Sequence, residues 1–228
     1  MADNLYSPYG DKSVNFITER VHYIAQALIK KNIKALVIAC NTATVNSIEQ
    51  LRLKVNIPVI GVEPAIKPAA KLSANKKIAI LSTLATSNNP RFNALVAEHN
   101  NGAEVIIQPC PGLVEFIEQG QQNSHACKLL LKSYIDPLLQ HGVDTLVLGC
   151  THYPFVLPQI SAITGDDIII IETSKPVTLQ LSKQLAKANL CANSKQQSQY
   201  HFYSSQPTKS LQSLVSLMWG NDIALNTI

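Results

Sequence analysis

The sequence predicts an α/β fold of two Rossmann-like lobes, each a doubly wound and mostly parallel sheet, with an active site in the cleft between them. Short apolar runs such as ALVIAC, KIAILST and TLVLGC alternate with longer segments of helical period, which is typical of parallel strands covered by helices. Two of these runs end in a cysteine, Cys40 and Cys150. Because ligands of open α/β sheets lie at the carboxyl ends of strands, we expect both thiols at the binding cleft.

The individual elements follow from local patterns. A helix is expected over residues 12–32, because apolar side chains recur there at steps of three and four from Val14 to Leu28. Strands are expected at short continuous apolar runs, namely residues 35–40, 58–62, 77–83, 103–109, 145–150 and 168–173. Further helices are expected at residues 46–55, 65–75, 113–120 and 127–142. The tail, residues 201–220, adds a short strand and a helix, which brings the expected strands to about seven.

The division into lobes follows the two cysteine segments, because each lobe is expected to contribute one of them. A Pro- and Ala-rich stretch at residues 62–76 suits the crossover between two similar halves. We therefore predict a first lobe of residues 1–63 plus 175–228 and a second lobe of residues 64–174.

Composition restricts the class of protein. With 228 residues and 46% hydrophobic content, the chain can fill a substantial core. Its apolar runs are too short to span a bilayer and its first residues lack the pattern of a signal peptide, so a cytoplasmic location is expected, with no membrane partner. The net charge of +4 comes from scattered lysines, which argues only weakly for nucleic acid; we expect no nucleic-acid partner, and a small anionic ligand fits equally well.

The cysteines indicate thiol chemistry rather than disulfides or metal. They are five in number and widely separated, without CxxC or a Cys/His pair at zinc spacing, so we expect reduced thiols and no metal site. A thiol placed where a strand meets a helix lies near free N–H groups, which favour the thiolate and attract an anionic substrate. A single buried cysteine is usually an inert small hydrophobe. Two cysteines in matched settings instead favour a functional role for Cys40 and Cys150. Cys110, Cys127 and Cys191 lack that setting and are interpreted as packing or incidental thiols.

Several motifs together resemble a known family. They are ACNTAT around Cys40, GCTHYP around Cys150, PYGDKS near the start, GVEPAIKPAAKLSAN between them and FYSSQPTKSLQSLVSLMWG near the end. In these motifs, which run through almost the whole chain, the sequence resembles glutamate racemase of the cofactor-independent amino-acid racemase superfamily. The resemblance implies interconversion of L- and D-glutamate without any cofactor, supplying D-glutamate for bacterial peptidoglycan. Relatives commonly dimerise, so it also allows a homodimer.

The resemblance also implies roles for individual residues. Cys40 and Cys150 act as the two bases, one thiolate and one thiol, which exchange roles between directions. His152, two residues after Cys150, assists as a catalytic residue by lowering the thiol pKa or shuttling its proton. The implied substrate contacts are Tyr9, Gly10, Asn41, Thr42, Thr86, Thr151 and His152. Asp3 and Glu118 match ionisable residues that tune or assist the thiols.

Each of these roles has a simpler structural alternative. Asn41, Thr42 and Thr151 suit helix N-caps whether or not they contact a ligand. His152 suits a structural hydrogen bond, Glu118 a solvated helix position, and Asp3 lies near a terminus, where disorder is common.

One departure from the family pattern concerns the start of the chain. Relatives open with a strand and an Asp-Ser-Gly-rich loop, and the residues before Asp3 do not match them. The missing strand is central in a doubly wound sheet, so its neighbours are expected to expose apolar surface and unpaired backbone groups. We therefore expect impaired activity and stability for the chain as given.

Three function classes remain open from the sequence. The leading one is a racemase of glutamate, with aspartate or another acidic amino acid as the alternative substrate. The second is a catalytically inactive, racemase-like binding protein. The third, a thiol redox protein, is weakly supported because the two cysteines belong to separate lobes and lack a resolving CxxC partner.

Overall fold

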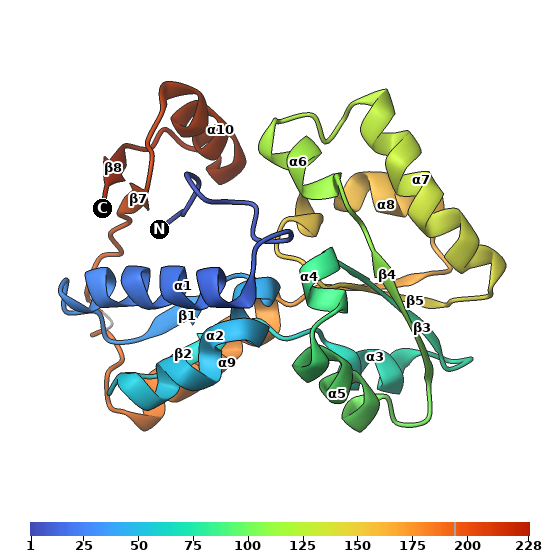
Figure 1. The fold of residues 1–228 in the computed structure, drawn as a ribbon, viewed down its shortest axis with the longest axis horizontal. Coiled ribbons are helices and arrows are strands. Elements are labelled where there is room, and N and C mark those ends of the chain that lie inside the picture. Colours follow the sequence, from blue (N-terminus) through green and yellow to red (C-terminus); the bar gives the residue numbers. More distant parts are fainter. Residues whose placement is uncertain (194) are drawn as a thin grey trace.

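The computed structural model describes residues 1–193 and 195–228. They form two groups of elements that lie side by side, each with parallel strands and covering helices (Figure 1). The first group comprises α1 (Val14–Ile29), β1 (Leu36–Ile38), α2 (Asn41–Lys54), β2 (Val59–Gly61), α9 (Ser174–Lys187), β7 (Phe202–Ser204), α10 (Lys209–Trp219) and β8 (Leu225–Thr227). The predicted α/β class with two lobes is confirmed.

The second group contains the larger sheet. Its elements are α3 (Ile66–Leu72), β3 (Lys77–Ser82), α4 (Leu84–Ser87), α5 (Pro90–His99), β4 (Glu104–Pro109), α6 (Leu113–Glu118), α7 (His125–Gln140), β5 (Thr145–Leu148), the 3₁₀ helix η1 (Tyr153–Val156), α8 (Leu157–Thr164) and β6 (Ile169–Ile171). Its strands are all parallel, in the order β4-β3-β5-β6. The chain leaves β3 toward β4 and returns on the other side to β5, so the strand order reverses at β3 and β5. This reversal is where open α/β sheets bind ligands.

Strand β3 shows why this sheet is covered on both faces. Ile78 and Ile80 pack in one apolar cluster, with α3 and α5, whereas Ala79 and Leu81 pack in another, with α6, α7 and α8. All four side chains are fully buried. Since successive strand residues point to opposite faces, the apolar run predicted a strand buried on both sides. This rigid sheet fixes the residues that follow β3 and β5.

The first lobe differs from the expected continuous sheet. Its strands form two separate parallel pairs, β1 with β2 and β7 with β8, and Ala2 adds an isolated bridge to Ser204. Within the described residues, β1 pairs only with β2, and Leu36–Ile38 line a cavity instead of meeting another strand. A third apolar cluster of α1, α2, β1 and β2 supports this half of the molecule.

The predicted elements agree with the structure where the apolar pattern was strong. The helix expected at residues 12–32 is α1, and the expected tail strand and helix are β7 and α10. The pattern missed α5, α8, α9 and the short strand β8, whose apolar faces are narrow or only partly buried. It also missed α4 and η1, which at four residues each are too short to show a period. In the part of the chain that the structure describes, no helix has the length and apolar character to cross a membrane.

Candidate active site

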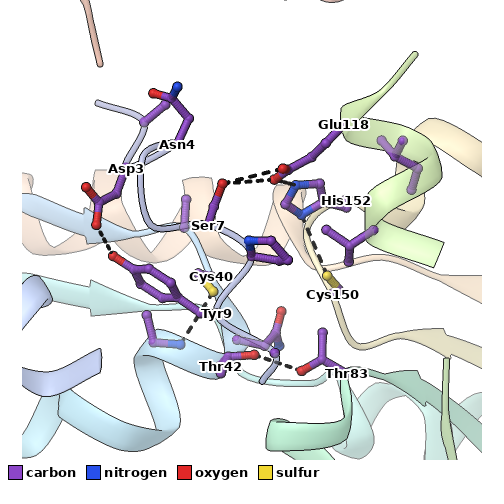
Figure 2. A pocket seen from close by; sticks show the side chains of 18 of the residues that line it. Asp3, Asn4, Ser7, Tyr9, Cys40, Thr42, Thr83, Glu118, Cys150 and His152 are labelled. Atoms are coloured by element: carbon purple, nitrogen blue, oxygen red, sulfur yellow. Dashed lines mark hydrogen bonds and ion pairs between the residues drawn. The ribbon is translucent and has the colours of Figure 1, made fainter. Parts of the chain in front are cut away.

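A cavity of about 690 Å³ lies between the lobes, and both cysteines of the matched motifs line it (Figure 2). Cys40 reaches it from the first lobe, between β1 and α2. Cys150 reaches it from the second lobe, just beyond β5. The structure therefore brings together two thiols that are far apart in the sequence.

Cys40 is the N-cap residue of α2. Its backbone is extended, with φ −155° and ψ 124°, and its sulfur accepts a hydrogen bond of 3.4 Å from the Ala43 N–H. Burial raises the pKa of the Cys40 thiol, and hydrogen bonds from the backbone N–H groups of Ala43 and Thr42 oppose that shift without cancelling it. The expected position of Cys40 between a strand and a helix is confirmed, although α2 begins at Asn41 rather than at residue 46. The expected preference for thiolate is wrong because desolvation outweighs the N–H groups.

Cys150 lies at the carboxyl end of β5 and is 8% exposed. A turn and then η1 follow it, rather than the α-helix expected from the sequence. Gly149 allows this path, because a Cβ there would lie 2.6 Å from the Leu81 carbonyl oxygen of the adjacent strand. Burial raises the pKa of Cys150 to about 12, and the nearby Cys40 adds to the rise. Both thiols are therefore protonated at neutral pH in the unliganded protein.

His152 connects Cys150 to an acidic side chain (Figure 2). Its Nδ1 lies 3.8 Å from the Cys150 sulfur, and its Nε2 lies 3.1 Å from Oε1 of Glu118 on α6. In the tautomer that donates from Nε2, Nδ1 is an acceptor for the thiol proton. Ser7 donates from the other side to both carboxylate oxygens of Glu118, at 3.3 and 3.4 Å. The structure thus groups His152 and Glu118 with Cys150, but the thiol pKa is raised by burial rather than lowered, which leaves proton shuttling as the role for His152.

Asn41 provides a polar group without a partner. It is 2% exposed and lines the cavity, and neither its amide nitrogen nor its amide oxygen has a hydrogen bond with any of the described residues. Leaving a buried amide unbonded costs about 1–3 kcal/mol, so such groups are rare in folded proteins. The amide is therefore available to a polar ligand, in agreement with the role that the resemblance implied.

Three threonines form a hydrogen-bonded triangle beside Cys40. The Thr42 hydroxyl lies 2.8 Å from that of Thr83 and 3.0 Å from that of Thr86, and the latter two are 3.0 Å apart. Thr42 and Thr83 line the cavity, whereas Thr86 is fully buried and is not among the lining residues. Thr86 therefore supports the other two hydroxyls rather than facing the cavity. Figure 2 shows the contact between Thr42 and Thr83.

The remaining predicted residues have mixed outcomes. Tyr9 and Gly10 line the cavity. Gly10 packs against Thr83, since a Cβ added to Gly10 would lie 3.5 Å from the Thr83 Cβ. Thr151 is not among the lining residues, and its hydroxyl donates to the Ala39 carbonyl. Asp3 lines the cavity, but its carboxylate accepts hydrogen bonds from Arg20 and from Tyr9 and has none with either thiol.

The charges at Asp3 and Tyr9 follow from these contacts. Although burial acts to raise it, the pKa of Asp3 is lowered, because Arg20 and Tyr9 stabilise the carboxylate. The pKa of Tyr9 is raised by burial and by the neighbouring carboxylate, so its hydroxyl stays neutral and donates. The alternative of a disordered Asp3 does not apply, because its carboxylate is held by Arg20 and Tyr9. The Asp3–Arg20 pair instead fixes the N-terminal segment that carries Tyr9 into the cavity.

The described lining residues of the cavity include no lysine and no arginine. An anionic ligand would therefore be held by backbone N–H groups, hydroxyls and the Asn41 amide, with the positive end of α2 adding to the attraction. Among the described residues, no group of three or more His, Cys, Asp or Glu side chains is placed to hold a metal ion.

Among the cavity residues that sequence reasoning missed are Ser7, Thr83 and Cys110. Thr83 and Ser7 come from segments whose local pattern carries no sign of a site, although the spacing of Thr83 and Thr86 in STLAT was visible. Cys110 packs in the core, as interpreted, but also lines the cavity, and burial raises its pKa to about 12.

Known proteins of similar sequence identify the family. A sequence model of the family described as Asp/Glu/Hydantoin racemase matches residues 10–177. A glutamate racemase from Pseudomonas paraeruginosa is 39% identical over 222 residues, which cover 97% of this chain and 83% of that protein. Another, from Pseudomonas aeruginosa, is 38% identical with the same coverage of both chains.

Solved structures give the same result for the fold. A glutamate racemase isoform from Bacillus anthracis superposes with a TM-score of 0.88 at 28% identity, covering 99% of this chain and 85% of that one. Escherichia coli glutamate racemase, solved with L-glutamate and the activator UDP-MurNAc-Ala, superposes with a TM-score of 0.85 at 28% identity and the same coverage. From the match over most of its length and the identity to these relatives, this chain belongs to the Asp/Glu/Hydantoin racemase family.

Proposed function

We propose that this protein interconverts L- and D-glutamate by a two-base mechanism in which Cys40 and Cys150 exchange protons with the α-carbon. The observation that carries the proposal is the placement of these two thiols, from opposite lobes, on one cavity. Removing a proton from one face of a carbon and returning one to the other face requires a group on each side.

The reaction starts with one cysteine as thiolate and the other as thiol. The thiolate takes the α-proton, so that a C–H bond breaks and an S–H bond forms, and the electron pair is left on the α-carbon and its carboxylate. The other thiol then donates its proton to the opposite face, so that a new C–H bond forms and this sulfur becomes the thiolate. The two sulfurs end with exchanged protonation states, ready for the reverse direction.

Burial makes each thiolate a stronger base but also makes it less populated. A thiolate whose conjugate acid has a pKa near 12 is a stronger base than an ordinary cysteine thiolate, which suits a weakly acidic α-proton. The same burial keeps the reactive thiolate a minor species in the free protein. Donors that stabilise the developing negative charge on the carboxylate include the unpartnered Asn41 amide and the Thr42 and Thr83 hydroxyls.

Glutamate as the substrate is supported by the relatives. The matched proteins are glutamate racemases, and the Francisella tularensis enzyme, with a TM-score of 0.85 at 27% identity, was solved with D-glutamate. The family resemblance implies that the D-glutamate is used to build peptidoglycan.

The lobe boundaries at residues 63/64 and 174/175 are part of the proposal, supported by the packing of α9 against β2. A homodimer and a cytoplasmic location stay predictions, as does the impaired activity expected from the start of the chain.

The proposal is tested by incubating the purified chain with L-glutamate, and separately with L-aspartate, in deuterated water. Expected is D-glutamate carrying deuterium at the α-carbon, detected by chiral chromatography and mass spectrometry, with little product from L-aspartate. Cys40→Ser and Cys150→Ser are each expected to lower turnover by about 10²–10⁴-fold. Cys191→Ser is the matched control, since Cys191 is exposed and is not among the cavity residues.

Each alternative gives a different outcome. D-Aspartate as the main product assigns the other acidic substrate. Binding of glutamate without any α-deuterium assigns a non-catalytic protein. Activity that is controlled reversibly by a Cys40–Cys150 disulfide assigns the redox class.

A further inference from the structure

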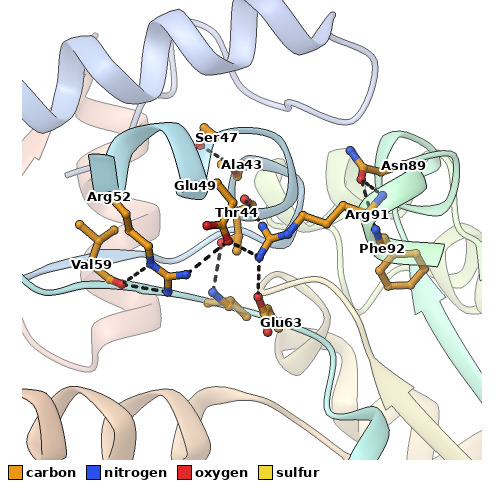
Figure 3. A network of polar contacts seen from close by, with 11 residues as sticks. Ala43, Thr44, Ser47, Glu49, Arg52, Val59, Glu63, Asn89, Arg91 and Phe92 are labelled. Atoms are coloured by element: carbon orange, nitrogen blue, oxygen red, sulfur yellow. Dashed lines mark hydrogen bonds and ion pairs between the residues drawn. The ribbon is translucent and has the colours of Figure 1, made fainter. Parts of the chain in front are cut away.

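Arg91 joins the two lobes at a distance from the thiols (Figure 3). It lies in the first turn of α5, in the second lobe, and its guanidinium reaches the first lobe. Nη2 lies 2.9 Å from the Glu49 carboxylate on α2 and 3.0 Å from the Glu63 carboxylate just beyond β2. Nη1 donates to the Thr44 carbonyl of α2 at 3.3 Å. One side chain thus binds three groups of the neighbouring lobe.

The contact belongs to a continuous seam along α2. At the helix start, the Thr42 hydroxyl binds those of Thr83 and Thr86. One turn later, the Asn89 amide donates to the Asn46 side chain at 2.8 Å, and Asn89 is also the N-cap of α5. Arg91 completes the seam in the next turn. Residues 83–91 of the second lobe therefore hold successive turns of α2.

The seam bears on the chemistry because α2 begins at Cys40. A helix moves nearly as a rigid rod, so a shift of α2 along its axis moves the Cys40 sulfur by a similar distance. Cys150 is fixed separately by the second-lobe sheet. The relative position of the two thiols thus depends on how α2 is held against the second lobe.

We propose that Arg91 is a positioning residue for racemisation, which sets the place of Cys40 relative to Cys150 by fixing α2 against the second lobe. This inference rests on the proposed function. Arginine suits the role because its contacts are divided between two nitrogens held in one plane, Nη2 for the carboxylates and Nη1 for the carbonyl, whereas lysine offers a single nitrogen. Glu49 and Glu63 remain 62% and 44% exposed, so both stay hydrated when Arg91 is removed and the fold is expected to persist.

Arg52 offers a matched control. It also pairs with Glu49, at 3.5 Å, and it donates to the Val59 carbonyl. Its partners among the described residues therefore lie in the first lobe. Arg91→Ala and Arg52→Ala each remove one arginine from the same carboxylate. Only the first removes a connection between the lobes.

The kinetic test compares Arg91→Ala, Arg91→Lys and Arg52→Ala with the unchanged chain. Arg91→Ala is expected to lower kcat about tenfold or more with KM changed less than about threefold, because a misplaced base slows proton transfer more than binding. Arg91→Lys is expected to recover part of that loss, and Arg52→Ala to stay within about twofold. Equal kcat values for Arg91→Ala and Arg52→Ala overturn the proposal.

A second measurement does not require turnover. Amide hydrogen exchange, followed by mass spectrometry, is expected to be several-fold faster over residues 41–49 in Arg91→Ala and unchanged there in Arg52→Ala. If the unchanged chain does not racemise glutamate, the proposed function fails and exchange alone decides whether Arg91 fixes α2. Unchanged exchange over residues 41–49 in Arg91→Ala overturns the inference, whatever the kinetics.

Discussion

The hydroxyl of Thr151 donates a hydrogen bond of 3.0 Å to the carbonyl oxygen of Ala39. Thr151 directly follows Cys150, and Ala39 directly precedes Cys40. This bond therefore joins the two backbone segments that carry the thiols, and these segments belong to different lobes. It restricts how far the two sulfurs can separate and gives Thr151 a structural role in place of the substrate contact that the sequence suggested.

Thr151→Val is expected to lower kcat/KM about tenfold, because it keeps the side-chain shape and removes the donor that ties the two segments together. Thr151→Ser keeps the hydroxyl and is expected to stay within about threefold of the unchanged chain. Both values are measured from the change in optical rotation of glutamate. The interpretation is wrong if the two variants are equally active.

Asn41→Ala is expected to weaken catalysis without lowering the stability of the fold. Because the buried amide of Asn41 has no partner, its removal costs no hydrogen bond in the free protein, so the melting temperature should stay the same or rise. The lost contact to the developing charge should lower kcat/KM about tenfold, equivalent to about 1.4 kcal/mol. Calorimetry and steady-state kinetics measure the two effects. A lower melting temperature with an unchanged kcat/KM would instead identify Asn41 as a structural residue.

Cys150 is expected to make the fold sensitive to alkali. Its pKa is about 12 in the folded protein, whereas a cysteine in an unfolded chain titrates near pH 8.5. Between these values the unfolded chain loses the proton and the folded one keeps it, so the free energy of unfolding falls as pH rises, by up to about 1.4 kcal/mol per pH unit. This stabilisation is fully present below about pH 8.5.

Urea unfolding at several values between pH 8 and pH 10 measures this effect. Cys150→Ser lacks the titrating thiol, so its free energy of unfolding should decline less steeply than that of the unchanged chain. Other groups that titrate in this range are common to both proteins and cancel in the comparison. Parallel declines would show that Cys150 is not desolvated as its burial implies.

Glu118→Gln is expected to disturb proton transfer at one thiol. Glu118 contacts His152, which contacts Cys150 and not Cys40, so slower transfer should affect only the steps at Cys150. With α-deuterated glutamate, the kinetic isotope effect should rise more for one enantiomer than for the other. Glu104→Gln is the control, since it removes the partner of His141 in a similar pair that is not at the cavity. Equal isotope effects for both enantiomers would contradict the prediction.

Much of the fold and the two cysteines could be predicted because their signals are local. An apolar run such as KIAILST predicts a strand wherever it occurs, since its residues need burial on both faces. Cys40 and Cys150 were found because each follows such a run directly. The N-cap role of Cys40 was not predicted: the helix was expected to begin at residue 46, and Asn41 and Thr42 were the N-cap candidates because their side chains suit that position better than a thiol.

Other parts of the site could not be predicted because they depend on contacts between distant segments. Ser7 meets Glu118, and Thr83 meets Thr42, only after the lobes have packed. Thr86 was chosen from its motif, but its neighbour Thr83 faces the cavity instead. The contact of Arg91 with Glu49 and Glu63 likewise has no signature in the sequence around any of the three residues.

The sequence by itself determined which residues can do the chemistry: two thiols at strand ends, each followed by polar side chains. The tertiary structure decided how those thiols behave. A helix N-terminus favours thiolate, and that local effect predicted a lowered pKa for Cys40, yet its pKa is raised. The reason is that a local dipole acts through the nearest residues, whereas desolvation depends on everything that packs around the sulfur once both lobes have come together.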